Sequence, residues 1–408
     1  MENSIRLIKP SVEDAINHLV SYAVPELEAD VISVASARGR ILAEDIISPM
    51  SVPPHDNAAL DGYAFRWADL PPSRCLPISG RVAAGRPLAS RLPWKTAVRI
   101  FTGAPMPEGS DTVAMQEDCS AEDGMVRLPE RIKAGENRRL AGEDVAEGAR
   151  AVSKGRRLRP QDLGLAAAVG RTKILVYRPL RVAICSTGDE VRDPGTPLAP
   201  GCIYDANRYT TAGLLNACGA EVSDLGILPD NLATTREALA NAASNHDLIV
   251  TSGGMSTGDE DHVKGAVQSI GSIHFWRIAL KPGRPVAMGD INGTPFVGLP
   301  GNPVSAMVTF ILIVRPLLMR MMGASDVMPR RFQVTSIFNF RRKSGRREFL
   351  RGRLETIDGK LAVRSYPTNS SGILSSMSWS DGLIDVPANC EEISPGDVLD
   401  FIPYSEVM

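Results

Sequence analysis

The sequence predicts a multidomain α/β protein: a central doubly wound, parallel-type α/β domain, a helical domain, a β-rich inserted domain and a C-terminal β-barrel-like domain. Three observations lead to this prediction. Apolar strands alternate with helices from 181 to 328, which is typical of a doubly wound sheet. Short β-like runs broken by Pro and Gly fill 48–142, and 329–408 is again strand-like. The expected domains are therefore 1–47 with 143–180 (helical), 48–142 (β-rich), 181–328 (α/β) and 329–408 (β).

The helical domain is predicted from two separate parts of the chain. Apolar residues recur at helical spacing over 10–24, and 35–46 is a second candidate helix. Helical patterning resumes at RPQDLGLAAAVG, where Pro160 occupies a first-turn position and Gly170 the position of a C-terminal cap. We therefore expect the chain to return to its first domain after 142, which makes the β-rich stretch an insertion.

The two later domains show their elements in order. The α/β domain is expected to contain strands and helices at 181–185, 206–218, 222–227, 232–243, 248–252, 263–270, 275–280 and 296–300, followed by a long helix from Pro303. In the last domain, IDGKLAV predicts a hairpin with Asp358-Gly359 at its turn, and EEISPGDVLDF supplies a closing strand.

Composition excludes several classes of protein. The 408 residues carry 45 Lys plus Arg against 47 Asp plus Glu, and 43% are hydrophobic, which argues against disorder and against a nucleic-acid-binding arm. The six cysteines form no CxxC pair and the five histidines show no ligand spacing, so reduced thiols in a cytoplasmic protein are expected. The longest apolar stretch, 307–314, ends at Arg315, which predicts neither a signal peptide nor a membrane span.

Small and acidic residues follow the apolar strands of the α/β domain. Ligands bind beyond the carboxyl ends of such strands, glycines let backbone N–H groups approach a phosphate, and carboxylates can hold Mg²⁺. Each loop alone is more often an ordinary strand-to-helix turn, but four on one sheet edge favour a ligand site. The candidates are Ser186, Thr187, Gly188 and Glu190; Asp230; Ser252, Gly253, Gly254 and Asp261; and the Gly301-Asn302-Pro303 turn, whose Asn is expected to cap a helix.

Cations accompany these loops. Lys281-Pro282-Gly283-Arg284 places two of them on a proline-stiffened turn. A basic cluster follows in the last domain: Arg341, Arg342, Lys343, Arg346, Arg347, Arg351 and Arg353. Such clusters are usually solvated faces, and nucleic-acid binding is an alternative. Because few aromatic residues interleave with it, we favour a small anionic ligand.

Several motifs together resemble one family. ALDGYAF, FTGAPMPEGSDTV, AGEDVAEG, LRPQDLGLAAAVG, STGDE, YDANRYTTAGLL, TSGGMSTGDEDH, KPGRP and GLPGNPVSA occur in the order found in the MoeA family, the molybdopterin molybdenumtransferases related to the C-terminal half of gephyrin. The resemblance spans most of the chain. It implies insertion of molybdenum from molybdate into adenylylated molybdopterin, with loss of AMP and dependence on Mg²⁺. It also implies an elongated four-domain homodimer.

The resemblance also implies roles for individual residues. Functional positions of the family fall on Asp61, Thr102, Glu190, Asp230, Asp261 and Lys281, with Glu190 and Asp261 as metal ligands. Substrate-binding positions fall on Ser186, Thr187, Gly188, Ser252, Gly253, Gly254, Pro300, Pro303, Ser305, Arg351 and Ser371. One departure is Arg277, where family members often carry lysine, so that a planar guanidinium replaces a point charge.

Two other functions stay open at this stage. One is the related adenylyltransferase, which shares the α/β domain but lacks the other three regions. The other is a non-catalytic scaffold that binds the pterin. The expected partners are adenylylated molybdopterin, molybdate and a second copy of the chain, with contacts to the adenylyltransferase and to molybdoenzyme maturation proteins as further expectations. No nucleic-acid or membrane partner is expected.

Overall fold

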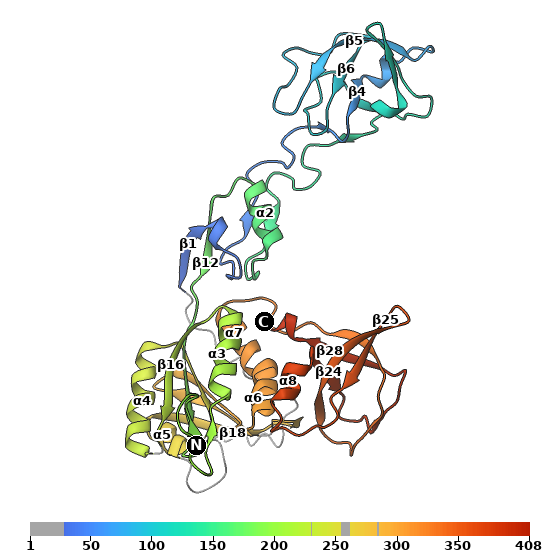
Figure 1. The fold of residues 1–408 in the computed structure, drawn as a ribbon. Coiled ribbons are helices and arrows are strands. Elements are labelled where there is room, and N and C mark those ends of the chain that lie inside the picture. Colours follow the sequence, from blue (N-terminus) through green and yellow to red (C-terminus); the bar gives the residue numbers. More distant parts are fainter. Residues whose placement is uncertain (1–27, 230, 254–261, 284) are drawn as a thin grey trace, which may run out of the picture.

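The computed structural model of the chain describes residues 28–229, 231–253, 262–283 and 285–408. These residues form an elongated molecule (Figure 1). A β-rich unit containing β4, β5 and β6 lies at one end, and a small unit containing β1, β12 and α2 lies in the middle. At the other end the α/β unit and the C-terminal β-barrel lie side by side.

The middle unit combines residues from before and after the β-rich unit. β1 (Ala29–Ser33) pairs antiparallel with β12 (Lys173–Tyr177), and β2 (Ile46–Ile47) pairs with β11 (Arg150–Val152). α2 (Pro160–Ala168) begins at Pro160, as predicted, and the Asp162 carboxylate accepts a hydrogen bond from the Arg159 N–H at 2.9 Å. Pairing between distant segments therefore returns the chain to this unit.

The prediction of a helix over 35–46 is wrong. The structure has only a 3₁₀ turn, η1 (Val34–Ser36), followed by Gly39 with a φ of +80°, a left-handed conformation that interrupts a helix. The apolar Ile41 and Leu42 then form bridges with Arg157 and Val176. These two residues are buried because they pair in extended conformation with residues far away in the sequence. Local periodicity does not reveal such pairing. The other helix predicted here, 10–24, lies outside the described residues.

The β-rich unit is built on a six-stranded sheet. Its strands lie in the order β7 (Thr112–Met115), β4 (Gly62–Phe65), β6 (Ala97–Ile100), β5 (Cys75–Val82), β9 (Met125–Arg127) and β8 (Ser120–Glu122). The short strands β3 (Asn57–Ala58) and β10 (Arg138–Arg139) pair beside it, and single turns η2 (Trp67–Asp69) and η3 (Gln116–Asp118) connect strands. Two buried apolar clusters fill this unit, which gives it a core of its own.

The α/β unit contains the predicted doubly wound sheet. Its strand order is β16 (Glu221–Leu228), β13 (Arg181–Thr187), β17 (Leu248–Ser252), β21 (Thr294–Leu299), β20 (Pro285–Ile291) and β18 (Gly271–Arg277). The first four strands are parallel, and β20 alone runs in the opposite direction, because it pairs antiparallel with both of its neighbours, β21 and β18. β20 was not predicted, although the Asn292-Gly293 turn that joins it to β21 is a strong hairpin signal.

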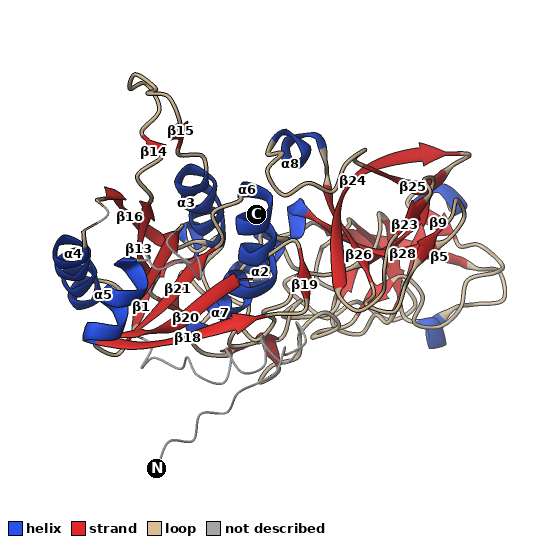
Figure 2. Cartoon of the chain, turned by 90° about the horizontal axis from the view of Figure 1, so that it is seen from below, coloured by secondary structure: helices blue, strands red, loops and turns tan. Residues whose placement is uncertain are grey.

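Helices cover both faces of this sheet (Figure 2). One face packs on α4 (Leu232–Asn245) and α5 (His262–Ile270). The other packs on α3 (Asn207–Cys218) and on a continuous helical rod of α6 (Pro303–Thr309), the π-turn η4 (Phe310–Val314) and α7 (Arg315–Met321). Among the described helices, this rod alone is long and apolar enough to span a membrane, but 94% of its most apolar window is buried, as in a core helix.

The C-terminal unit is a closed barrel of five strands, as predicted. β24 (Arg347–Ile357), β25 (Lys360–Ser365), β22 (Phe332–Ser336), β28 (Val398–Pro403) and β26 (Gly382–Val386) close because β26 also pairs with β24. Asp358 and Gly359, both with positive φ, form the predicted hairpin turn. β19 (Leu280–Lys281) adds to β24, and α8 (Ser375–Trp379) packs outside. The remaining short strands are β14 (Val191–Arg192), β15 (Ile203–Tyr204), β23 (Phe340–Arg341) and β27 (Glu392–Ile393), with the 3₁₀ turn η5 (Tyr404–Glu406).

Candidate functional site

A pocket of about 120 Å³ lies at the carboxyl ends of the parallel strands β13, β17 and β21. Its wall brings together predicted site residues from three separate loops: Ser186, Thr187, Glu190, Ser252, Gly253 and Pro303. It also contains Gly301 of the predicted Gly301-Asn302-Pro303 turn, and residues that were not predicted as site residues: Val191, Ile203, Tyr204, Asp205, Ala206 and Asn207. The strand ends thus form one concave surface of small polar side chains.

Two hydroxyl groups in this pocket have no hydrogen-bond partner in the part of the chain that the structure describes. The Ser186 Oγ and Thr187 Oγ1 atoms are buried and make no hydrogen bond with any described residue. A buried hydroxyl without a partner costs free energy, so such groups commonly mark a place where a ligand or water completes the hydrogen bonding. The hydroxyls are therefore suited to donate to phosphate oxygens.

The backbone around the pocket requires glycine at two predicted positions. Gly253 has a φ of +85°, and a Cβ built there would lie 2.5 Å from the Thr187 carbonyl oxygen. Gly188 has a φ of +134°, and its Cβ would lie 2.5 Å from a carboxylate oxygen of Glu190. A side chain at Gly253 would therefore force the loops after β13 and β17 apart, whereas a side chain at Gly188 would displace the Glu190 carboxylate and strain the backbone of its own loop.

Glu190 places an exposed carboxylate at the edge of the pocket. Its backbone carbonyl accepts a hydrogen bond from the Ile203 N–H at 2.8 Å, which fixes the loop that carries it. No group of three or more His, Cys, Asp or Glu side chains is placed to hold a metal ion within the described residues. Asp261, the second predicted metal ligand, lies outside them, as do the predicted site residues Asp230 and Gly254.

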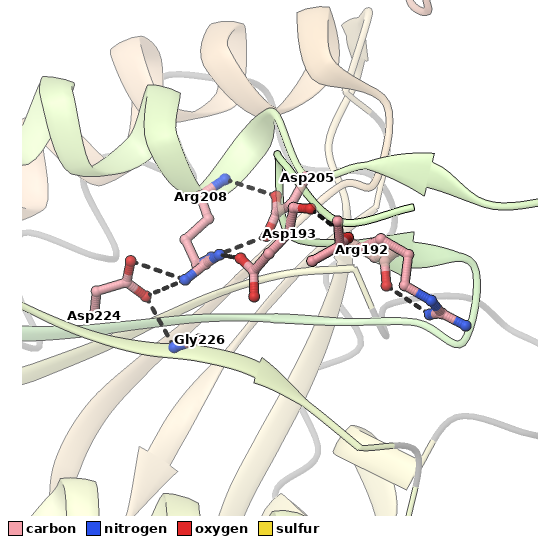
Figure 3. A network of polar contacts seen from close by, with 8 residues as sticks. Arg192, Asp193, Asp205, Arg208, Asp224 and Gly226 are labelled. Carbon is pink, nitrogen blue, oxygen red and sulfur yellow. Dashed lines mark hydrogen bonds and ion pairs between the residues drawn. The ribbon is translucent and has the colours of Figure 1, made fainter. Parts of the chain in front are cut away.

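An ionic network around the buried Arg208 includes Asp205, a residue of the pocket wall (Figure 3). The Arg208 guanidinium bonds Asp205 at 3.0 Å, both carboxylate oxygens of Asp224 at 2.7 and 2.9 Å, and Asp193. Burial opposes its charge, but the hydrogen bonds to Asp224 and Asp205 outweigh burial and raise the pKa of Arg208. Arg208 thereby ties α3 to strand β16 and to the arm between β14 and β15.

Asn207 was missed by sequence reasoning, although it belongs to the YDANRY motif. Its Nδ2 atom donates to the Ser252 Oγ at 2.8 Å and to the Gly301 carbonyl at 2.7 Å. It therefore joins the end of β17 to the turn before α6. A polar residue at the start of a helix that follows a strand was the signal that could have identified it.

The turn before α6 brings the C-terminal unit to the pocket. Asn302 makes no side-chain capping bond, contrary to prediction, and Pro303 occupies the first helical position. The Val304 N–H instead donates to the Ser371 carbonyl at 3.1 Å, and Ser305 is buried within the same helix. The predicted residues Pro303, Ser305 and Ser371 are therefore neighbours, and the buried Pro300 ends the preceding strand.

A second, larger pocket of about 290 Å³ carries most of the basic cluster. It is lined by Lys281, Arg341, Arg342, Lys343, Arg346, Glu348 and Asn369. The buried Glu348 carboxylate binds the Lys281 Nζ at 2.8 Å and lies 3.6 Å from the Arg342 guanidinium. One carboxylate thus faces five cations, so the pocket has a net positive charge suited to an anion.

Arg351 is buried in the barrel wall rather than solvated. Its Nε donates to the Ser376 Oγ at 3.1 Å and its Nη2 to the Thr368 carbonyl at 2.6 Å, whereas its Nη1 has no partner among the described residues. Burial lowers the pKa of this guanidinium. A buried cation with one unused donor is a suitable partner for an oxyanion. Arg277 lies in β18, but its side chain lies outside the description.

Asp61 and Thr102 form a pair elsewhere in the molecule. The Asp61 carboxylate accepts hydrogen bonds from the Thr102 hydroxyl at 2.7 Å and from its N–H at 2.8 Å, and these two bonds lower the pKa of Asp61. The pair belongs to the β-rich unit, which lies at the opposite end of the molecule from the α/β unit (Figure 1). Within one copy, these two predicted residues are therefore not brought to the others.

Comparison with known proteins finds family models that match most of the chain. Three family models match successive regions: the MoeA N-terminal region (domain I and II) at 10–170, a probable molybdopterin binding domain at 183–320, and the MoeA C-terminal region (domain IV) at 333–404. A molybdopterin molybdenumtransferase of Haemophilus influenzae is 40% identical, with 93% of this chain and 95% of that protein covered. Molybdopterin molybdenumtransferase 2 of Mycobacterium tuberculosis is 36% identical, with 90% and 93% covered.

Solved structures agree with the sequence matches. A molybdopterin biosynthesis MoeA protein from Pyrococcus horikoshii superposes with a TM-score of 0.83 at 28% identity, covering 97% of this chain and all of the other. A second structure of MoeA from that organism gives 0.76 at 30% identity, covering 97% and 99%. With family models along its length and relatives of this similarity, the chain belongs to the MoeA family of molybdopterin molybdenumtransferases.

Proposed function

We propose that this chain transfers molybdenum from molybdate to adenylylated molybdopterin, with release of AMP, as a Mg²⁺-dependent homodimer in the cytoplasm. The observation that carries the proposal is the pocket at the ends of β13, β17 and β21, where two buried hydroxyls have no hydrogen-bond partner among the described residues. The chain's relatives carry the name of this activity, and the pocket lies within the region matched by the molybdopterin binding model.

The pocket would hold the phosphate end of the pterin. Ser186 and Thr187 offer hydroxyl donors, and the left-handed turn at Gly253 leaves the backbone open to a ligand. Asn207 keeps the Ser252 hydroxyl and the Gly301 turn in place. Donors fixed before the substrate arrives need no reorganisation during the reaction, which is how such groups lower a barrier.

Glu190 is suited to bind Mg²⁺, because its carboxylate is exposed at the edge of the phosphate pocket. Bound Mg²⁺ would neutralise the charge that develops on the phosphoanhydride. The chain's own contribution is to hold the Glu190 loop through the hydrogen bond between Ile203 and Glu190 and through the Arg208 network.

The oxyanion would bind to cations of the C-terminal unit and β19. Arg351 has an unused buried donor, and Lys281 opens onto the basic pocket. Molybdate would therefore meet positive charge before it reaches the pterin. The pterin supplies the sulfur ligands of molybdenum, so no cysteine is required; Cys185 in β13 is buried, and burial raises the pKa of its thiol to about 12, which keeps it neutral.

The homodimer would complete the site. Asp61 and Thr102 lie at the far end of the elongated chain, so in a symmetric pair the β-rich unit of one copy can face the α/β unit of the other. The negative Asp61, held by Thr102, would then approach the Mg²⁺ region of the partner copy.

Nucleotide product analysis tests this function. Purified protein is incubated with adenylylated molybdopterin, with and without molybdate and with and without Mg²⁺. We expect AMP only when both are present, and no consumption of ATP. Pyrophosphate release from ATP and free molybdopterin would identify an adenylyltransferase, and pterin binding without any product would identify a scaffold; either result would contradict the proposal.

A further inference from the structure

One face of the β-rich sheet carries a row of arginine and aromatic side chains. Strand pairing places Tyr63 of β4 opposite Arg99 of β6, and Arg99 opposite Arg81 of β5. Phe101 follows Arg99 by two positions, so it lies on the same side of the sheet. We call Tyr63, Arg81, Arg99 and Phe101 the arginine–aromatic row. Three of its members are partly exposed and Arg81 is exposed.

The planar groups of this row stack on one another. The Arg99 guanidinium carbon lies 5.1 Å from the Tyr63 ring centre and 4.9 Å from that of Phe101. The Arg81 guanidinium carbon lies 4.6 Å from the Phe101 ring centre. Arg99 is further fixed by donating to the Gly62 carbonyl at 3.1 Å and to the Gln116 Oε1 atom. The row is therefore a rigid surface of alternating cations and rings.

The positive charge of the row is not neutralised by ion pairs. Among the described residues, neither Arg81 nor Arg99 forms an ion pair with a carboxylate, and the hydrogen-bond acceptors of Arg99 are neutral groups. Guanidinium planes and aromatic rings both stack on flat heterocycles, and two cations, of which Arg99 has an acidic neighbour in Asp61, favour an anionic one. A nucleoside monophosphate combines these two properties.

The row adjoins the Asp61–Thr102 pair. Arg99 binds the carbonyl of Gly62, which follows Asp61, and Phe101 directly precedes Thr102. The row and the Asp61–Thr102 pair are therefore neighbours in the β-rich unit. The substrate in the proposed function carries a purine nucleotide at one end, so the present inference rests on that proposal.

We propose that the arginine–aromatic row is the binding surface for the adenylate end of the substrate. The purine would stack beside Phe101 and the Arg81 guanidinium, and the phosphate would lie near the positive charge of Arg81 and Arg99. In the dimer, this surface would bind the adenylate while the α/β unit of the partner copy binds the pterin phosphate. No residue of the row was predicted as a site residue from the sequence.

Equilibrium binding of AMP to the full-length protein tests this surface, without molybdate and without turnover. Phe101→Leu removes the ring but keeps an apolar side chain, and Arg81→Gln removes the charge but keeps a long polar side chain. We expect each to weaken AMP binding by about tenfold, the usual effect of losing one stacking or cation–π partner. Arg86→Ala, an exposed arginine of the same unit outside the row, is the matched control and should bind AMP like the wild type.

Three further ligands define what the row recognises. Adenosine lacks the phosphate and ribose 5-phosphate lacks the base, so both should bind more weakly than AMP. Pterin-6-carboxylate tests the other planar end of the substrate. The proposal would be overturned if the protein bound the pterin in a Phe101-dependent way but did not bind AMP. It would also be overturned if both variants bound AMP like the wild type while their circular dichroism showed the wild-type fold. If AMP binding depends on Phe101 but molybdate-dependent AMP release is absent, the proposed function fails and this surface stands.

Discussion

Arg208 is the residue on which the pocket wall depends most. Its side chain is 6% exposed, and its partner Asp205, which lines the pocket, is 3% exposed. Asp193 and Asp224 are about half exposed, so their charges are largely compensated by water. The energetic effect of losing Arg208 is therefore concentrated on Asp205, whose carboxylate would remain buried without a cation.

Replacement of Arg208 by Met should lower the free energy of unfolding by about 3–5 kcal/mol, because a buried carboxylate loses its partner. Arg208→Lys should recover part of that loss, since it restores charge but not the planar fork that bonds three carboxylates. Urea denaturation at pH 7 measures both. A loss below about 1 kcal/mol in Arg208→Met would show that Asp205 is solvated in the folded protein.

Glu190→Gln should act on the reaction and not on stability. The carboxylate is exposed, so the melting temperature should stay within about 1 °C of the wild type. Molybdate-dependent AMP release should fall at least about 100-fold, and its dependence on Mg²⁺ concentration should change, because a charged ligand is lost. Glu221→Gln, an exposed carboxylate at the opposite end of the sheet, serves as the control. An unchanged dependence of AMP release on Mg²⁺ concentration would show that Glu190 does not bind Mg²⁺.

At the scale of elements, the start of β17 anchors the connection between the middle unit and the α/β unit. The Asp247 carboxylate accepts two hydrogen bonds from the Arg178 guanidinium, at 2.7 and 2.8 Å, and one from the Arg181 N–H at 2.7 Å. Burial acts to raise the pKa of Asp247, but these hydrogen bonds outweigh burial and lower it. The connector between β12 and β13 is thereby fixed to the sheet.

This arrangement gives a pH-dependent contribution to stability. Because the pKa of Asp247 is lower in the folded than in the unfolded protein, its contribution is complete above the unfolded value of 3.8 and disappears as pH falls through the folded value. Asp247→Asn should therefore lower the free energy of unfolding by about 1–2 kcal/mol at pH 7, and the difference from wild type should shrink below pH 4. Denaturant titrations at several pH values measure the difference; a constant gap would exclude this role.

The elements that the sequence predicted correctly are those whose burial pattern is local. The strands and helices from 181 to 270 and the barrel hairpin at Asp358-Gly359 show clear periodicity or turn chemistry, and the loops after β13 and β17 could be identified as one site edge. The segment 35–46 failed because Ile41 and Leu42 are buried by bridges to residues more than 100 positions away. The Arg208 network could not be predicted either, since Asp193 and Asp224 approach it only in the folded chain.

At the scale of the whole molecule, the elongated shape separates the β-rich unit, which contains Asp61, from the α/β unit, which contains Glu190, within one copy (Figure 1). If two copies complete each other's sites, two inactive variants can restore activity in a mixed dimer. Asp61→Ala and Glu190→Ala should each be inactive alone. Co-expressed at equal levels they should give about a quarter of wild-type activity, because half of the dimers are mixed and each mixed dimer contains one intact site.

Size-exclusion chromatography of differently tagged copies verifies that mixed dimers form. Co-expression of Glu190→Ala with a Thr102→Val variant should give the same recovery. Co-expression of Asp61→Ala with Thr102→Val should give none, because both changes lie in the same half of the site. No recovery in the first two pairs despite mixed dimers would place all these residues in one copy's site. Recovery in the last pair would show that Asp61 and Thr102 act in different sites.

The backbone pairing of Val52 with Val145 would allow the β-rich unit to be removed from the chain. These two residues exchange both backbone hydrogen bonds, at 2.7 and 3.1 Å, so the chain leaves and re-enters the middle unit at a single point. The 92 residues between them form the β-rich unit, which has its own apolar core. A tight two-residue turn could replace this unit at little entropic cost, because Val52 and Val145 are already in contact. The shortened chain would keep the entire pocket of the α/β unit and lose Asp61, Thr102 and the arginine–aromatic row in one step, so that ligand binding by the pocket could be measured without the β-rich unit.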